Sequence, residues 1–386
     1  MKGRLLLLLV LLGLSVGCRE PFEPEIAADD QNILVVAGYL DSDGLPSVLT
    51  LSTTTSIGDD GFFPDFTPLF GADIFLESSS GQRFPLLELE NGQYLFETDI
   101  DESDTYRLRI LLRNGNSYTS EELKPVITPD IIDVSFVKNE TGVEVFLTTQ
   151  GDENADDFLW TYEETWSFRP AITTQWEYDP ETQDVVLRDP EDRIDLCYRS
   201  ERNSDLILET SSRFEDQFVF RQSIAQIDQG DEKLSTRYSI LISQKALSKS
   251  DVEFWEILKR NSDDLGSIFS PLPSLVGGNI ELDQNPEVPV IGQVSLGKVR
   301  QKRLFIDRQE ISPWSVEVPE YAGCILSADT VLVADYDLLF KSGVNIPSTP
   351  IYPENAFNPI GFRYGSINCV DCTIRGTNIK PSFWED

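Results

Sequence analysis

The amino-acid sequence predicts a mainly β protein, with an N-terminal immunoglobulin- or transthyretin-like β-sandwich and a larger C-terminal β-rich domain that contains one long helix. Short apolar runs recur along the chain, separated by turns at intervals of about 8–12 residues, which is the spacing typical of a sandwich. Asn91-Gly92 and Asn114-Gly115 are dipeptides that favour tight hairpin turns. A single stretch, 248–265, shows a convincing helical pattern.

The N-terminal domain is expected over residues 31–127. Its predicted strands are the runs ILVVAGYL, SVLTLS, ADIFLES, RFPLLEL, GQYLFET and TYRLRILLR. The boundary is placed at the prolines Pro125 and Pro129, because proline interrupts a strand ladder.

The C-terminal domain is expected over residues 128–386. Its predicted strands include IIDVSFV, GVEVFLTT, FLWTYEETWSF, QFVFRQSI and YSILIS, followed after the helix by PVIGQVSLGKV and KRLFIDRQEI. Residues 169–195 are rich in turn and charged residues, so we expect an excursion from the sheet there. The proline-rich stretch 342–365 is expected to be irregular.

The helix 248–265 is predicted from an apolar face. Leu247, Phe254, Leu258 and Leu265 follow one another at spacings of seven and four residues. Ser250 and Glu253 have the spacing of a capping box, which satisfies free N–H groups at a helix start. We expect this face to pack on a sheet; the alternative is that it fills a groove on a partner.

Composition excludes several classes of function. The 386-residue chain is 40% hydrophobic, enough for two cored domains. It has a net charge of −35, which repels nucleic acid and anionic lipid headgroups, so neither is expected as a partner. It contains no histidine, which removes Ser-His-Asp and Cys-His catalysis and His-ligated metal sites.

The amino terminus reads as a lipoprotein signal. Lys2 and Arg4 precede a short apolar core at 5–12, too short to span a bilayer, and then Gly17-Cys18. A small residue before cysteine resembles the site at which signal peptidase II cleaves and a diacylglyceryl group is attached. We therefore expect a signal peptide at 1–17, a lipid on Cys18 and an acidic, proline-containing tether at 18–30. The lipid would be the only membrane anchor, and no other cofactor is expected.

The run from Ser243 to Gly292 has the pattern S-x-x-A-L-S, then F-W-x-x-L, a proline-containing turn, Gly278-Asn279-Ile280 and Ile291-Gly292. With the terminal C-x-x-C and K-P-x-F-W, this resembles the domain-of-unknown-function 4249 lipoproteins of Bacteroidota. The resemblance implies no established enzymatic activity. It also implies an outer-membrane partner of a TonB-dependent transporter, because these lipoproteins are often encoded beside one. The acidic segment directly behind Cys18 is similar to the surface-export signals of Bacteroidota lipoproteins, so exposure at the cell surface is expected.

The remaining cysteines are an even set, which in an exported protein favours two disulfides. They are Cys197, Cys324, Cys369 and Cys372, and three pairings are possible. A redox role for Cys369-Val-Asp-Cys372 is disfavoured, because no βαβ unit precedes it. A four-thiolate zinc site is disfavoured as well, since Cys197 and Cys324 lie far apart.

Other polar clusters are interpreted as solvated turns. The acidic loops 41–44, 58–61, 99–104 and 152–157 lack the ligand spacing of an EF-hand, so no metal site is expected. Carboxylate pairs able to hydrolyse glycosides arise by chance in so acidic a chain, so no catalytic residue is assigned. The tryptophans at 160, 166 and 176 are interpreted as packing residues; the alternative is a sugar-stacking platform.

The segment 58–70 contains Phe62, Phe63 and Phe66 among turn residues, with no strand periodicity. It either covers its own sandwich or presents an apolar patch to a partner. The resemblance to the family implies an accessory subunit of a TonB-dependent transporter, or of another envelope protein, that assists ligand capture or gating. The alternatives are a free-standing surface module that binds glycan or peptide, and a structural subunit of an envelope complex.

Overall fold

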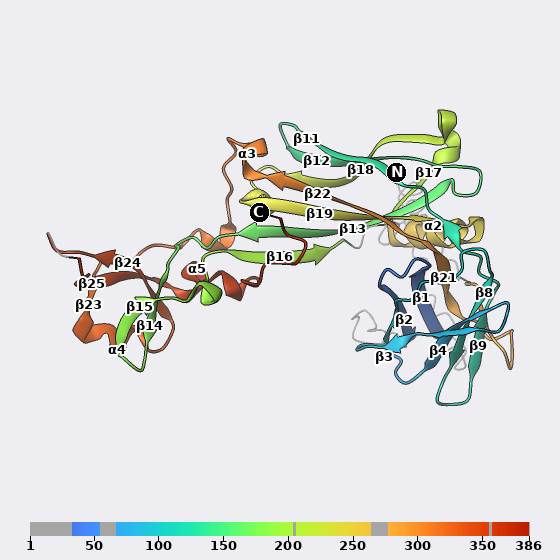
Figure 1. Cartoon of the computed structure of the whole chain (residues 1–386), viewed down its shortest axis with the longest axis horizontal. Helices are drawn as coiled ribbons and strands as arrows, with labels where there is room; N and C mark the ends of the chain where they lie inside the picture. The colour runs from blue at the N-terminus through green and yellow to red at the C-terminus, as the bar shows by residue number, and fades with distance from the viewer. Residues whose placement is uncertain (1–32, 55–66, 204–205, 264–276, 355–356, 386) are drawn as a thin grey trace, which may run out of the picture.

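The computed structural model describes residues 33–54, 67–203, 206–263, 277–354 and 357–385. The fold is mainly β, as predicted, and is organised as two β bodies and a smaller lobe (Figure 1). The N-terminal sandwich lies at one end of the molecule and the lobe at the other, with the larger C-terminal body between them.

The N-terminal sandwich consists of two sheets that face each other across one core. The first has the order β10-β21-β1-β2-β7-β6, with β3 paired to β2. Its strands are β1 (Leu34–Asp41), β2 (Ser47–Thr53), β3 (Thr67–Pro68), β6 (Leu87–Glu88), β7 (Gln93–Phe96), β10 (Val126–Ile127) and β21 (Ile291–Lys298). The second has the order β20-β9-β8-β4-β5, with β4 (Asp73–Ser78), β5 (Arg83–Pro85), β8 (Tyr106–Leu111), β9 (Ser117–Ser120) and β20 (Ile280–Leu282).

Both sheets place alternate apolar side chains in the shared core, as a half-buried strand requires. Val36, Leu49, Tyr94, Leu108 and Ile110 are among its fully buried members. The predicted turn at Asn91-Gly92 is confirmed, since both residues have positive φ values, 56° and 70°.

The sandwich is completed by strands from far along the chain. β21 runs parallel to β1, and β20 pairs antiparallel with β9. At the β1–β21 contact, Gly292 has a φ of 118°, and a Cβ there would collide with the carbonyl of Val36. Only glycine fits this position. The division at residue 127 expected from the sequence does not anticipate this return of residues 280–298 to the first body.

The C-terminal body is a second pair of sheets around its own core. One sheet has the order β11-β12-β18, with β11 (Ile131–Lys138), β12 (Gly142–Gln150) and β18 (Phe218–Asp228). The other has the order β16-β13-β19-β22, with β17 paired to β13. Its strands are β13 (Asp157–Phe168), β16 (Cys197–Arg202), β17 (Ile207–Thr210), β19 (Arg237–Ala246) and β22 (Arg300–Asp307).

Trp160 is fully buried in this second core, and its indole N–H donates to Gln244 Oε1 at 2.9 Å. Gln244 Nε2 in turn donates to the Pro129 carbonyl at 2.8 Å and to Thr149 Oγ1 at 3.1 Å. The buried amide is therefore hydrogen-bonded on both sides, as a low-dielectric interior requires.

The distal lobe, as we name residues 172–194 and 324–370, contains β14 (Trp176–Asp179), β15 (Asp184–Leu187), β23 (Val331–Leu332), β24 (Asn345–Ile351), β25 (Gly361–Ser366), α4 (Tyr336–Phe340) and α5 (Ile367–Val370). The expectation that 342–365 is irregular was wrong, because β24 and β25 form a hairpin within it. β24 lies at the end of the order β23-β25-β24, where a strand can contain prolines such as Pro347 and Pro350 without losing a ladder bond.

The long helix predicted at 248–265 is confirmed as α2 (Lys249–Asp263); residues 264 and 265 lie outside the described ranges. α3 (Arg308–Ile311) follows β22. Short 3-10 turns complete the described elements: η1 (Pro190–Asp192), η2 (Ser211–Arg213), η3 (Glu215–Gln217), η4 (Glu232–Leu234), η5 (Pro319–Tyr321), η6 (Val333–Asp335) and η7 (Cys372–Ile374).

Candidate functional site: the junction of the two β bodies

The two bodies are joined where one strand continues into the other. β21 of the sandwich ends at Lys298 and β22 of the C-terminal body begins at Arg300, so only Val299 separates them. The backbone N–H of Val299 donates to Asp41 Oδ2 at 2.7 Å. Asp41 Oδ1 accepts from the N–H groups of Asp43 and Leu45 at 2.9 and 2.8 Å.

The carboxylate of Asp41 is buried and each of its oxygens accepts at least one hydrogen bond. The interpretation of Asp41 as part of a solvated turn was therefore wrong. Sequence reasoning missed its role because the N–H of Val299 reaches it only through the tertiary fold, from 258 residues away.

A second contact links β1 to the end of β19. The phenol of Tyr39 donates to the Ala246 carbonyl at 3.1 Å, and the Ala246 N–H donates to Thr128 Oγ1 at 2.8 Å. Tyr39, Ala246 and Thr128 are all buried. Burial raises the pKa of Tyr39, so its hydroxyl stays protonated and able to donate. The connection between the bodies is therefore held by two side chains of β1, Tyr39 and Asp41.

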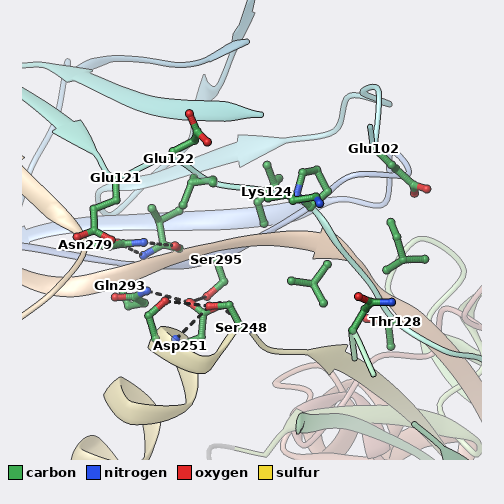
Figure 2. A pocket seen from close by; sticks show the side chains of 18 of the residues that line it. Glu102, Glu121, Glu122, Lys124, Thr128, Ser248, Asp251, Asn279, Gln293 and Ser295 are labelled. Atoms are coloured by element: carbon green, nitrogen blue, oxygen red, sulfur yellow. Dashed lines mark hydrogen bonds between the residues drawn. The ribbon is translucent and has the colours of Figure 1, made fainter. Parts of the chain in front are cut away.

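A third contact lies at the amino end of α2 (Figure 2). Ser248 Oγ accepts from the N–H of Asp251 at 3.2 Å, and the N–H of Ser248 donates to Asp251 Oδ2 at 3.0 Å. This reciprocal pair is a capping box. The prediction that Ser250 and Glu253 form the box was wrong: the helix begins two residues earlier than that spacing implies. Ser248-x-x-Asp251 carries the same sequence signal, and the pattern alone did not distinguish them.

The other oxygen of Asp251 reaches the sandwich. Oδ1 accepts from Gln293 Nε2 at 2.9 Å and from Ser295 Oγ at 2.6 Å, both on β21. Figure 2 shows the Asp251 carboxylate turned from the start of α2 toward these two side chains. Asp251, Gln293 and Ser295 are all buried. One carboxylate therefore caps the helix and ties it to the first body.

The third contact, made by Ser248, Asp251, Gln293 and Ser295, forms the floor of a cavity of about 810 Å³ between the bodies. Its rim includes exposed Glu121, Glu122 and Lys124. Arg300, also on the wall, is paired with Asp130 at 2.9 Å. The buried floor groups are already hydrogen-bonded within the protein, so a ligand would have to be held by the rim and not by the floor.

The cysteines form two disulfides, as predicted, and the structure selects the pairing. Cys197 is bonded to Cys372, and Cys324 is bonded to Cys369. The two cysteines of the C-x-x-C motif thus bond to different partners and not to each other. Within the described residues, no group of three or more Cys, Asp or Glu side chains is arranged to hold a metal ion.

The disulfides clamp the distal lobe. Cys324 and Cys369 join the two ends of its second segment, and Cys197 and Cys372 join the residues that follow its first and second segments. The expected stapled tail is confirmed by Trp384, which is buried against Tyr198 and Phe305. The lobe and the tail are thereby fixed to β16 and β22.

Several other predicted residues can be placed. Trp160 and Trp166 are buried in the C-terminal core, and Trp176 packs inside the distal lobe against Phe362. The packing interpretation is confirmed for all three. Phe254 is buried and Trp255 is partly buried against the joint between the bodies, so the start of the helix packs inward as expected.

Cys18 and the phenylalanines at 62, 63 and 66 lie outside the described residues. Their roles as lipid attachment site and partner-contact candidates stay predictions. Among the residues that the structure describes, no helix combines the length and the apolar composition needed to cross a membrane.

Comparison with known proteins supports a family assignment and little else. None of the curated proteins compared with the chain matches it. A two-domain fibronectin type-III segment from chicken tenascin is similar at 11% identity, covering 56% of this chain and 91% of that one, with a TM-score of 0.17. A cycloalternan-degrading enzyme from Trueperella pyogenes, in complex with isomaltose, matches at 11% identity over 73% of this chain and 34% of its own, with a TM-score of 0.15.

CBD12 from CALX1.2 matches at 10% identity, covering 70% of this chain and 97% of that one, with a TM-score of 0.14. Similarities this low say nothing about function. The model of one family, the domain of unknown function DUF4249, matches residues 19–303, which includes the sandwich, α2 and the return of β20 and β21. The chain belongs to the DUF4249 family.

Proposed function

We propose that the mature chain is a lipid-anchored outer-membrane protein, exposed at the cell surface, that binds a TonB-dependent transporter through its distal lobe and assists ligand capture or gating. The transporter as partner comes from the family resemblance. The structure contributes the exposed apolar side chains of the distal lobe.

The anchor is supported by Gly17-Cys18 behind a short apolar run. The first described residue, Ile33, follows Cys18 by 15 positions and leads directly into β1. An extended tether of this length reaches at most about 50 Å. The sandwich would therefore stand close to the membrane surface, with the C-terminal body and the distal lobe projecting from it.

The observation that supports partner binding most is the exposure of apolar side chains on the distal lobe. Among the described residues, the three most exposed large apolar side chains are Phe357 at 98%, Ile325 at 81% and Leu338 at 78%, and all three belong to this lobe. Leu332, Val333, Val344, Tyr352 and Ile360 are also exposed there. Several exposed apolar side chains on one small lobe are a feature of surfaces that bind a partner.

Part of this surface is continuous through the sheet. Leu332 pairs with Gly361 on β25, and the N–H of neighbouring Ile360 donates to the Ile351 carbonyl at 2.8 Å. Leu332, Tyr352 and Ile360 therefore lie at the same end of the sheet. Because the net charge of −35 repels anionic lipid and nucleic acid, a protein partner accounts for the apolar surface best.

The test is copurification from gently solubilised outer membranes. Phe357→Ser with Leu338→Ser should leave the melting temperature unchanged, because both side chains are exposed. The same double variant should lose the transporter from the purified complex. Phe220→Ser is the matched control, since Phe220 is 70% exposed on β18 of the C-terminal body. Retention of the transporter by the double variant would contradict docking through the lobe.

The alternative function, a free-standing surface module that binds glycan or peptide, is supported by the cavity of about 810 Å³ at the junction. Concave surfaces between domains are common ligand sites. Wild-type protein that is recovered from membranes without a transporter, and that binds glycan or peptide when purified alone, would favour this alternative.

A further inference from the structure

A second cavity, of about 550 Å³, lies at the junction and is lined in part by β1. One wall is the outer face of the sheet that contains β13, β19 and β22, which contributes Leu159, Thr161, Ser243 and Gln301. The facing wall comes from β1 and α2, with Tyr39 and Trp255. This cavity involves neither the distal lobe nor the membrane anchor, so a ligand bound in it would be independent of the proposed function.

Lys245 of β19 projects into this cavity. Its neighbours Gln244 and Ala246 are buried on the core face of the strand, and side chains alternate along a strand, so Lys245 faces outward with Ser243 and Leu241. Its Nζ lies 5.6 Å from the centre of the Tyr39 ring. That ring is held in place by the hydrogen bond of its hydroxyl to the Ala246 carbonyl.

The ammonium group of Lys245 has no counterion in the described part of the chain, where neither a hydrogen bond nor an ion pair joins its Nζ to another residue. The two carboxylates on the cavity wall are already engaged: Asp41 accepts from three backbone N–H groups, and Glu163 pairs with Arg202 at 3.1 Å. Desolvation lowers the pKa of Lys245 to about 8. In a chain with 66 acidic residues, an unpaired, partly buried lysine is exceptional.

The indole of Trp255 lies in the same wall. Its N–H is buried and has no hydrogen-bond acceptor among the described residues. This N–H is also shielded from the cavity space, so Trp255 contributes its aromatic ring to the wall and not an exposed donor. Within the described structure, the cavity therefore combines an unpaired cation with two aromatic rings.

We propose that this cavity binds a small organic carboxylate, with the carboxylate on Lys245 Nζ and the apolar part of the ligand against Tyr39 and Trp255. A carboxylate supplies the missing counterion with a single negative charge. Phosphate is a poorer fit, because it carries more charge into a strongly acidic protein and the cavity offers one free cation among the described residues. The polar groups of Thr161 and Gln301 would orient the bound ligand by hydrogen bonding.

The binding test pairs each carboxylate probe with its neutral amide. 3-Phenylpropanoate, indole-3-acetate and octanoate, and the three corresponding amides, are titrated into the folded full-length mature protein at pH 7 by isothermal calorimetry. At least one carboxylate should bind at least tenfold more tightly than its amide. Lys245→Met should abolish that preference, and Lys341→Met, which removes an exposed lysine of the distal lobe, should retain it.

The rate at which the Lys245 amine is acetylated distinguishes a ligand-binding role from a purely structural one. Brief acetylation followed by mass spectrometry should show Lys245 reacting as an amine that titrates near pH 8, and the best carboxylate should protect it. The proposal is overturned if no carboxylate exceeds its amide, if Lys245→Met binds as the wild type does, or if bound carboxylate leaves the labelling rate of Lys245 unchanged.

Discussion

The backbone N–H of Val299, the single residue between β21 and β22, is hydrogen-bonded at 2.7 Å to the buried carboxylate of Asp41. The contact lies where the chain leaves the sandwich for the C-terminal body. One carboxylate therefore holds both the turn after β1 and this crossing point.

Asp41→Asn should weaken this joint selectively. The amide oxygen can still accept from Asp43 and Leu45, but its NH₂ group would face the N–H of Val299. An unsatisfied buried donor costs about 1–3 kcal/mol in the free energy of unfolding, which urea denaturation would measure. The control is Asp43→Asn, which loses a half-exposed ion pair to Lys298 and should cost less than about 1 kcal/mol. Equal losses in the free energy of unfolding for Asp41→Asn and Asp43→Asn would contradict a special role for Asp41 where the two bodies meet.

Asp251→Ala should lower the free energy of unfolding by more than the loss of an ordinary helix cap does. It removes the acceptor for Ser248, Gln293 and Ser295 together and leaves buried donors unpaired. We expect about 2–4 kcal/mol of destabilisation by urea denaturation. Glu253→Ala at the exposed alternative capping position should cost less than about 0.5 kcal/mol. A larger loss of stability for Glu253→Ala than for Asp251→Ala would support the Ser250–Glu253 capping box expected from the sequence.

The distal lobe should depend on its disulfides more than either β body does. Replacing Cys324 and Cys369 with Ser opens a loop with a sequence separation of 45 residues, worth about 2–4 kcal/mol to the folded lobe. Limited proteolysis of this variant should cut first within 324–369, while the N-terminal sandwich stays intact. Mass spectrometry of the fragments would locate the cuts, and wild-type protein digested in the same way is the control. Identical digestion patterns would show that the lobe is stable without the bond.

Lys245→Met should stabilise the protein in a pH-dependent way. The folded-state pKa of about 8 lies below the ordinary lysine value of 10.5, so the unfolded chain binds more protons between these pH values. The penalty of the buried charge is therefore full below pH 8 and disappears as the pH rises toward 10.5. We expect the variant to gain about 2 kcal/mol at pH 7, and little at pH 10.5.

The surrounding elements contribute Tyr39, Asp41, Glu163 and Arg202 to the same cavity wall, so the measurement needs a control for the general effect of pH. Lys341→Met provides it, because Lys341 is exposed and paired with Asp337 at 3.1 Å. A pH-independent difference between wild type and Lys245→Met would mean that Lys245 titrates normally.

Cys18→Ala should move the protein from the membrane fraction to the soluble fraction, because the lipid on Cys18 is the expected anchor. Wild-type protein should incorporate labelled palmitate and the variant should not. The lipid hypothesis fails if the variant still sediments with membranes and the wild type takes up no label.

The strands and the helix were predictable because they rest on local patterns. The alternation in 34–41 and 47–53, the Asn91-Gly92 turn and the apolar face of α2 each act over a few residues. The hairpin of β24 and β25 was missed because its prolines suit an edge strand, and the sequence does not show which strands lie at edges. The capping box was misplaced because two overlapping patterns fit the same rule.

Local signals in the sequence were enough for the mainly β class, the family, the exported character expected from the amino terminus and the number of disulfides. These follow from composition, period and motif, which need no knowledge of distant contacts. The disulfide pairing, the return of β20 and β21 to the sandwich, and the meeting of Asp41 with Val299 and of Lys245 with Tyr39 emerged only from the folded chain. The partners in these contacts are 45 to 258 residues apart in the sequence. They are brought together by the packing of whole strand and sheet faces, which no local signal specifies.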